Sequence, residues 1–114
     1  MTQQHPRTVM ATYRVKPGCE AQFRAVLGEH RQRWQKLNLV TDRPWIWMRS
    51  YVDPKLIVEV FEWRSAEAVE AAHRNPEVLA LWGRMEQLCE IVGVPLRELP
   101  EAAEQFPHFE AFEP

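Results

Sequence analysis

Hydrophobic residues are most concentrated between Trp45 and Trp63, where the sequence reads WIWMRSYVDPKLIVEVFEW. Two extended apolar runs joined by Asp53-Pro54-Lys55 predict a β-hairpin. A hairpin with one solvated face alternates apolar and polar residues, whereas both faces of this hairpin are largely apolar. Both faces therefore need cover, and the helical segments elsewhere in the chain suffice for one of them. We expect a second copy of the chain to cover the other face, which predicts a homodimer.

The two faces of the hairpin can be assigned if Pro54 and Lys55 form a two-residue tip, because side chains alternate along each strand. One face then has the composition of a core interrupted by two polar residues, Ser50 and Glu59. Its members are Ile46, Met48, Ser50, Val52, Ile57, Glu59, Phe61 and Trp63. The other face combines aromatic residues with an arginine, a mixture that interfaces favour. The residues that we predict at the dimer interface are Trp45, Trp47, Arg49 and Tyr51.

The rest of the chain predicts one more strand, two helical segments and a final edge strand. Residues 8–16 alternate like a half-buried strand, and residues 19–38 carry apolar positions at helical spacing. A second helical segment spans about 66–91 and is bent where Pro76 restarts it. Residues 108–113 are compatible with a last edge strand. The order β-α-β-β-α-β predicts an α+β, ferredoxin-like fold with an antiparallel sheet and both helices on one face.

The length and charge of the chain are those of one domain without general affinity for nucleic acid. Its 114 residues carry a net charge of −2, so we expect a single domain over 1–114 and no nucleic-acid partner. The core is expected over about 8–90, followed by an extended acidic tail over 94–114. After Arg97 this tail has five glutamates and no lysine or arginine. It is either a solvated surface or a segment that docks on the basic first helix.

The two cysteines, Cys19 and Cys89, are far apart in the sequence and belong to no CxxC or Cys/His cluster. We therefore predict no metal site and no redox motif. Reduced, partly buried thiols are expected, with a disulfide as the alternative. No apolar run reaches membrane-spanning length, and the first residues, MTQQHPR, lack the apolar region of a signal peptide. These features predict a cytoplasmic protein without a membrane partner.

Three stretches carry a resemblance to a known family: YRVKPG, FEWRSAEAVEAA and HRNPEVLALW. Together with the helix and hairpin between them, they resemble the dimeric α/β-barrel superfamily, and within it the antibiotic biosynthesis monooxygenase group. The likeness covers roughly residues 8–90. It implies a dimeric α/β barrel in which a ligand binds between helices and sheet inside each subunit. Members of the superfamily include cofactor-independent oxygenases of polycyclic phenols and haem-degrading monooxygenases.

The haem-degrading members of that superfamily share three groups, and this chain matches one of them. Trp63 corresponds to their tryptophan at the end of the third strand. The first strand has no asparagine, and Trp82 occupies the position of their haem-ligating histidine. The resemblance therefore implies a small aromatic ligand rather than haem, and we predict no cofactor.

Glu59 is the most unusual residue of the hairpin, because it places a carboxylate between Ile57 and Phe61 on the core-like face. An unpaired buried carboxylate is costly and usually acquires a partner or a raised pKa. It is expected either to deprotonate a phenolic or enolic substrate, or to form an ion pair with an arginine or histidine. If the hairpin has another register, Glu59 is exposed instead. His73, at the helix break, is the second catalytic candidate, with helix capping or exposure to water as its alternatives.

Several other residues are candidates for a substrate pocket. His30 lies on the apolar stripe of the first helix and is either a pocket group or a hydrogen-bonded core histidine. Aromatic residues of the core would stack against an aromatic ligand if a cavity is present. The residues predicted to line the pocket are Trp63, Trp82, Phe61, Ser50 and His30.

The sequence is compatible with three kinds of function. The first is a cofactor-independent, monooxygenase-like protein that acts on or binds a small aromatic or polyketide-like molecule between sheet and helices. The second is a non-catalytic small-molecule-binding or stress-associated dimer of the same fold. The third is an interaction module without a cavity. The first is the leading hypothesis, and fold analogy alone separates it from the other two.

Overall fold

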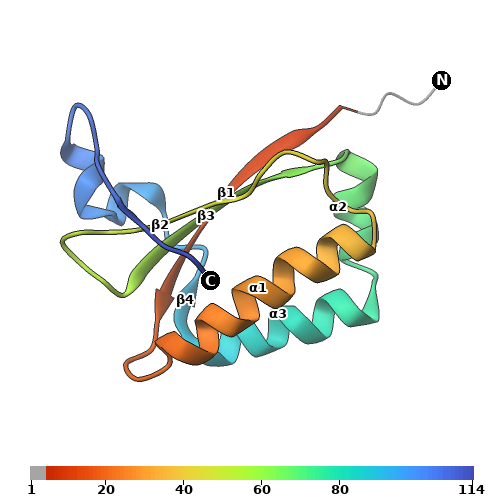
Figure 1. The fold of residues 1–114 in the computed structure, drawn as a ribbon, viewed down its shortest axis with the longest axis horizontal. Coiled ribbons are helices and arrows are strands. Elements are labelled where there is room, and N and C mark those ends of the chain that lie inside the picture. The colour runs from red at the N-terminus through yellow and green to blue at the C-terminus, as the bar shows by residue number, and fades with distance from the viewer. Residues whose placement is uncertain (1–4) are drawn as a thin grey trace.

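The computed structural model describes residues 5–114, which form one five-stranded sheet and three α-helices (Figure 1). The strands are β1 Arg7–Val15, β2 Ile46–Arg49, β3 Leu56–Trp63, β4 Cys89–Val92 and β5 Glu110–Ala111. The helices are α1 Glu20–Lys36, α2 Ala66–Ala72 and α3 Pro76–Leu88, and the C-terminal segment adds the short 3₁₀ helices η1 Leu96–Glu98 and η2 Pro100–Ala103. The predicted α+β class is confirmed.

All strand pairs of the sheet are antiparallel, and the strand order is β4-β1-β3-β2-β5. The first four strands have the ferredoxin-like order. Helices α1 and α3 lie side by side over one face of the sheet, which we call the helix face (Figure 1). We call the opposite side the open face. The predicted ferredoxin-like arrangement is thus confirmed.

The strand that completes this arrangement is not the one predicted. The second helical segment ends at Leu88 instead of Ile91, and β4 follows at once and pairs with β1. Ile91 and Val92 favour extended backbone, and Gly93, with a φ of 83°, then turns the chain away. The last strand predicted over 108–113 is reduced to the two residues of β5, which are added at the opposite edge beside β2.

The start of each helix after the hairpin follows from local capping. The Ser65 hydroxyl accepts a hydrogen bond from the backbone N–H of Ala68, at 3.1 Å, and caps α2. The Asn75 side chain accepts one from the backbone N–H of Glu77, at 2.8 Å, and caps α3. Pro76 occupies the first turn of α3. The predicted restart of the helix at Pro76 is confirmed.

The hairpin register differs from the prediction, because its turn is longer than two residues. Trp47 pairs with Glu59 rather than with Glu62. The Ser50 hydroxyl accepts hydrogen bonds from the backbone N–H groups of Val52 and Asp53, at 3.1 and 2.9 Å, and these bonds stabilise the wider turn. Because the register moves by an odd number of residues, β2 is turned over relative to β3.

The corrected register changes which residues of β2 lie under the helices. Trp45 and Trp47 are buried in the main core on the helix face, together with Glu59 of β3. Met48 and Ser50 lie on the open face instead. The predicted dimer interface rested on the two-residue tip, so placing Trp45 and Trp47 on the open face is wrong.

The C-terminal segment covers part of the open face, at the end nearest the hairpin turn (Figure 1). Val94, Leu99 and Phe109 pack there with Leu56 and Val58 of β3. The chain itself therefore supplies some of the cover that we expected from a second copy.

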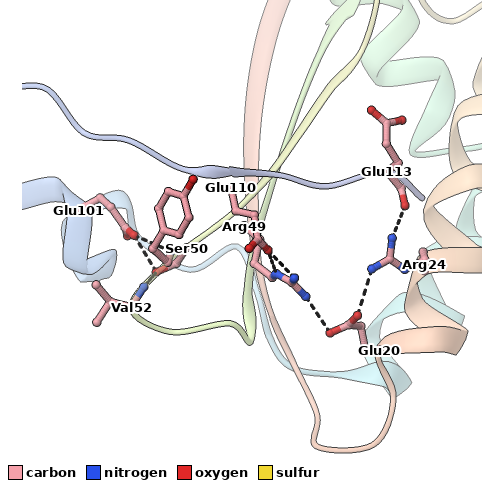
Figure 2. A network of polar contacts seen from close by, with 9 residues as sticks. Glu20, Arg24, Arg49, Ser50, Val52, Glu101, Glu110 and Glu113 are labelled. Atoms are coloured by element: carbon pink, nitrogen blue, oxygen red, sulfur yellow. Dashed lines mark hydrogen bonds and ion pairs between the residues drawn. The ribbon is translucent and has the colours of Figure 1, made fainter.

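The C-terminal segment then passes the edge of β2 and returns toward α1 (Figure 2). Nε of Arg49 donates a hydrogen bond to Glu110 at 2.7 Å, and Arg24 of α1 donates one to the backbone carbonyl of Glu113. Phe112 is buried, and the guanidinium of Arg24 lies 4.1 Å from its ring centroid. Of the two predicted arrangements of the acidic tail, the structure has the docked one.

Candidate functional site

A buried carboxylate lies at the centre of the sheet, on the helix face. Glu59 is in the central strand β3, paired with Ala11 of β1 on one side and with Trp47 of β2 on the other. Its exposed fraction is 0 %. The predicted burial of Glu59 follows from its position in the middle strand, beneath α1.

Three side chains from three different elements hydrogen-bond to this carboxylate. The Tyr13 hydroxyl donates to Oε1 at 2.7 Å, and Nε1 of Trp47 donates to Oε2 at 3.0 Å. Nδ1 of His30 on α1 lies 3.1 Å from Oε2. We call these four residues the Glu59 cluster. Because a buried charge is tolerated only when its hydrogen-bonding capacity is met, the cluster explains how Glu59 can occupy the core.

The Glu59 cluster supplies hydrogen-bond donors to both oxygens of the Glu59 carboxylate. The tyrosine hydroxyl, the indole N–H and the imidazole Nδ1–H can all donate to the two carboxylate oxygens, which suits an ionised carboxylate. Burial raises the pKa of Tyr13 well above its ordinary value, and the charge and hydrogen bond of Glu59 raise it further. Tyr13 is therefore held as a neutral phenol that donates to Glu59.

His30 connects the Glu59 cluster to an aromatic wall. Its ring centroid lies 4.1 Å from that of Trp34, 5.2 Å from that of Trp45 and 5.5 Å from that of Phe61, each at a nearly perpendicular angle. Its other nitrogen, Nε2, is buried and has no hydrogen-bond partner among residues 5–114. His30 is thus the hydrogen-bonded core histidine that we predicted as one of its two roles.

A pocket of about 290 Å³ lies beside the Glu59 cluster, between α3 and the part of the sheet where β4 meets β1. Its lining consists of Tyr13, His73, Trp82, Met85, Glu86 and Val92. Tyr13 belongs both to this lining and to the Glu59 cluster. The pocket and the buried carboxylate are therefore joined through one side chain.

His73 is exposed at the end of α2 and lies against the pocket. Its Nδ1 lies 2.8 Å from the carbonyl oxygen of Val69, and its ring centroid lies 5.0 Å from that of Trp82. When Nδ1 carries the proton of this hydrogen bond, Nε2 is left as an acceptor. The structure thus combines the helix-end position that we predicted with a place in the pocket lining.

The predicted pocket residues do not all lie together. Trp82 lines the pocket, whereas Phe61 and Trp63 are buried in the main core beside the aromatic residues of α1. Ser50 lies on the open face, where its hydroxyl donates to Glu101 at 2.9 Å (Figure 2). The two-residue tip had placed Ser50 on the same side as Glu59, so that placement is wrong.

The two remaining residues of the predicted interface lie near the hairpin turn. Arg49 is half-buried and donates hydrogen bonds to Glu110 and Glu20 (Figure 2). Tyr51 is exposed. Their contact with a second copy stays a prediction.

Sequence reasoning missed two members of the Glu59 cluster, Tyr13 and Trp47. Trp47 was assigned to the wrong side of the hairpin, and a longer turn would have placed it directly opposite Glu59. Tyr13 lies two residues beyond Ala11, the partner of Glu59 on β1, on the same side of the sheet. This second signal depends on the register of β1 against β3, which the sequence does not provide.

Within residues 5–114, no group of three or more His, Cys, Asp or Glu side chains is arranged to hold a metal ion. Over the same residues, no helix combines the length and apolar character needed to cross a membrane.

No protein-family model matches the sequence, and no curated protein matches it either. Solved structures do match its fold. SnoaB, a cofactor-independent oxygenase from Streptomyces nogalater, has a TM-score of 0.64 and 16% identity over 84% of this chain and 98% of its own. Rv0793 from Mycobacterium tuberculosis has a TM-score of 0.61 and 21% identity over 81% of this chain and 96% of its own.

A third similar structure is a protein of Nitrosomonas europaea assigned to the antibiotic biosynthesis monooxygenases. Its TM-score is 0.60, with 13% identity over 86% of this chain and 97% of its own. At such identities the likeness concerns the fold. The chain has the ferredoxin-like α+β fold of antibiotic biosynthesis monooxygenase-like domains, so the fold that the resemblance implied is confirmed.

Proposed function

We propose that the chain is a monooxygenase-type enzyme that needs no bound cofactor and acts on a small aromatic or polyketide-like molecule. The observation that carries the proposal is the fully buried Glu59 carboxylate, joined by one hydrogen bond to a residue of the pocket lining. Buried acid–base groups beside a pocket are typical of catalytic sites. The fold of SnoaB, described as a cofactor-independent oxygenase, is consistent with this, although a shared fold does not determine a shared reaction.

The pocket suits a small planar ligand. Trp82, Met85 and Val92 give it apolar walls, and the indole of Trp82 provides a surface on which an aromatic ring can stack. His73 and Glu86 supply the polar groups. The volume of about 290 Å³ lies just below the range of roughly 300–1,000 Å³ for small-molecule sites, which suits a small ligand.

The reaction would oxidise an activated CH₂ group of a phenolic or enolic substrate to a carbonyl. Removal of one proton by the Glu59 cluster or by His73 gives an enolate whose carbon is electron-rich. Molecular oxygen bonds to that carbon, and the resulting peroxide takes up a proton. The hydroperoxide then loses water and leaves the new carbonyl, so that one oxygen atom enters the product and the other enters water.

A direct test is to measure oxygen consumption and tryptophan fluorescence while adding an anthrone, a polycyclic compound with such a CH₂ group. We expect saturable quenching of fluorescence and consumption of one O₂ per anthrone. Glu59→Gln should keep the quenching and lose oxygen consumption by about 10²-fold or more, the usual weight of an acid–base group. Glu90→Gln is the control, since Glu90 is an exposed glutamate of β4.

The outcomes of this test separate the three functions. Quenching without oxygen consumption in the wild type would contradict the enzyme and favour a non-catalytic binding protein. Neither quenching nor oxygen consumption would favour an interaction module.

We also propose that a second copy of the chain covers the part of the open face that the C-terminal segment leaves free. Met10, Val60 and Ile46 form a row across β1, β3 and β2 there, and Met10 and Ile46 are 48 % and 53 % exposed. Ile46→Lys should halve the mass measured by light scattering, because a symmetric interface would bury the introduced lysine of each copy. Leu79→Lys on α3, also an exposed apolar residue, is the matched control. An unchanged mass for Ile46→Lys would exclude this surface as the interface.

A further inference from the structure

A ligand in the pocket reaches the Glu59 carboxylate most directly through Tyr13. Glu59 has no exposed surface, and its two oxygens are occupied by hydrogen bonds from the other members of the Glu59 cluster. Tyr13 lines the pocket, and its hydroxyl lies 2.7 Å from Oε1 of Glu59. A tyrosine hydroxyl that donates one hydrogen bond still has lone pairs with which to accept another.

We propose that Tyr13 is a catalytic residue that contacts the hydroxyl group of a phenolic or enolic substrate and relays its proton to Glu59. This inference rests on the proposed function. The substrate O–H bond breaks while a new O–H bond forms at Tyr13 Oη. The original proton of Tyr13 passes at the same time to Oε1 of Glu59. The products are a substrate oxyanion, a neutral tyrosine and a neutral carboxyl group, and no electrons are exchanged between the molecules.

The surroundings of the two residues favour a coupled transfer over two separate steps. The pKa of Tyr13 is raised by burial and by Glu59, so an ionised tyrosine is unfavourable and its hydroxyl has to gain one proton as it gives up the other. Trp47 and His30 both bond to Oε2 and hold the carboxylate in place. Oε1 therefore faces Tyr13 and is the oxygen that receives the proton.

His73 offers a competing route, because it also lines the pocket and can act on a ligand directly. The two routes predict different variants to be inactive. In the relay, Tyr13→Phe removes the group that contacts the substrate, and Glu59→Gln removes the final acceptor. In the direct route, only His73→Ala has such an effect.

The test uses a hydroxyanthraquinone, whose absorption moves to longer wavelength when its hydroxyl ionises. This probe reports proton transfer without requiring any reaction with oxygen. Bound to the wild type, we expect it to ionise at a pH at which the free probe is neutral. Tyr13→Phe and Glu59→Gln should bind it within about threefold of wild-type affinity but reduce the ionised fraction at least tenfold.

Tyr51→Phe is the matched control, because Tyr51 is the only other tyrosine of the chain and is exposed in the hairpin turn. It should leave ionisation unchanged. Should Tyr13→Phe fail to fold, as judged by circular dichroism, Glu59→Gln tests the same relay with Tyr13 still present.

The relay is overturned if Tyr13→Phe binds the probe and ionises it as the wild type does, or if only His73→Ala abolishes ionisation. It is also overturned if the wild type binds the probe without ionising it, or does not bind it. Ionisation that depends on Tyr13 and Glu59, in a protein that consumes no oxygen with an anthrone, would support the relay while contradicting the monooxygenase.

Discussion

Replacing Glu59 by leucine tests whether the Glu59 cluster is a unit that the carboxylate holds together. The substitution removes the acceptor shared by the Tyr13 hydroxyl, the Trp47 indole N–H and Nδ1 of His30, all of which are buried. Leucine has a similar volume, so the change leaves little empty space and acts mainly through lost hydrogen bonds. Each stranded donor costs about 1–3 kcal/mol, which sets an upper bound of about 9 kcal/mol for three.

Part of that cost is offset, because the variant no longer buries a carboxylate. Because this offset cancels part of the upper bound, we expect Glu59→Leu to cost about 3–5 kcal/mol, between one and three stranded donors. Glu59→Gln should cost only about 1–2 kcal/mol, because its amide oxygen can still accept from Trp47 and His30 while the Tyr13 hydroxyl turns to accept from the amide. The sharper part of the prediction is the ranking, in which Glu59→Leu destabilises the fold more than Glu59→Gln does.

The free energy of unfolding can be measured by urea denaturation, followed by tryptophan fluorescence. Glu90→Gln, an exposed substitution, should change it by no more than about 0.5 kcal/mol. Adding Tyr13→Phe to Glu59→Leu removes one stranded donor, so the double variant should be less destabilised than the sum of the two single variants. A Glu59→Leu protein as stable as the wild type would refute the reasoning, since three buried donors would then cost nothing without their acceptor.

Three further predictions concern other parts of the chain. Phe112→Ala should speed amide hydrogen exchange in β5 but not in β1 or β3, because the buried Phe112 ring holds the C-terminal segment against α1. Unchanged exchange in β5 would contradict this. Burial raises the pKa of the Cys89 thiol to about 12, whereas Cys19 is half-buried. In the native protein at pH 8, mass spectrometry should therefore find that iodoacetamide modifies Cys19 well before Cys89. Equal rates of modification would contradict this. The hydrogen bond from Arg84 lowers the pKa of Glu29. This pair therefore stabilises the fold fully above about pH 4.5, and its contribution is lost as the pH falls through the lowered pKa. Arg84→Gln should therefore make the free energy of unfolding, measured by urea denaturation, fall less steeply with decreasing pH; an unchanged slope would contradict this.

Local sequence signals were enough to predict the helices and the class of the fold. Ser65 and Asn75 cap their helices with their own side chains, and Pro76 occupies the position where a proline starts a helix. Such signals involve residues only a few positions apart, so they can be recognised without knowledge of the sheet. The burial of Glu59 could be predicted for a similar reason, because the residues on either side of it are apolar.

The composition of the Glu59 cluster could not be predicted, because it depends on contacts between distant segments. The hairpin register goes with a turn longer than two residues, in which the backbone N–H groups of Val52 and Asp53 donate to the Ser50 side chain. A two-residue tip is the simplest assumption. It places the other face of β2 toward the helices, and so it removes Trp47 from the site. Tyr13 reaches Glu59 only once β1 pairs with β3 in a particular register, and that register follows from packing of the whole sheet.

The path of the C-terminal segment also bears on how the protein resists aggregation. An unpaired edge strand presents free backbone groups that can recruit strands of other molecules. Here β5 pairs with β2 through only two residues, Glu110 and Ala111, and Pro107 and Pro114 lie on either side of it. Because proline cannot donate a backbone hydrogen bond, this edge offers few free N–H groups with which another strand could pair. The acidic C-terminal segment therefore also shields the β2 edge of the sheet from pairing with strands of other molecules.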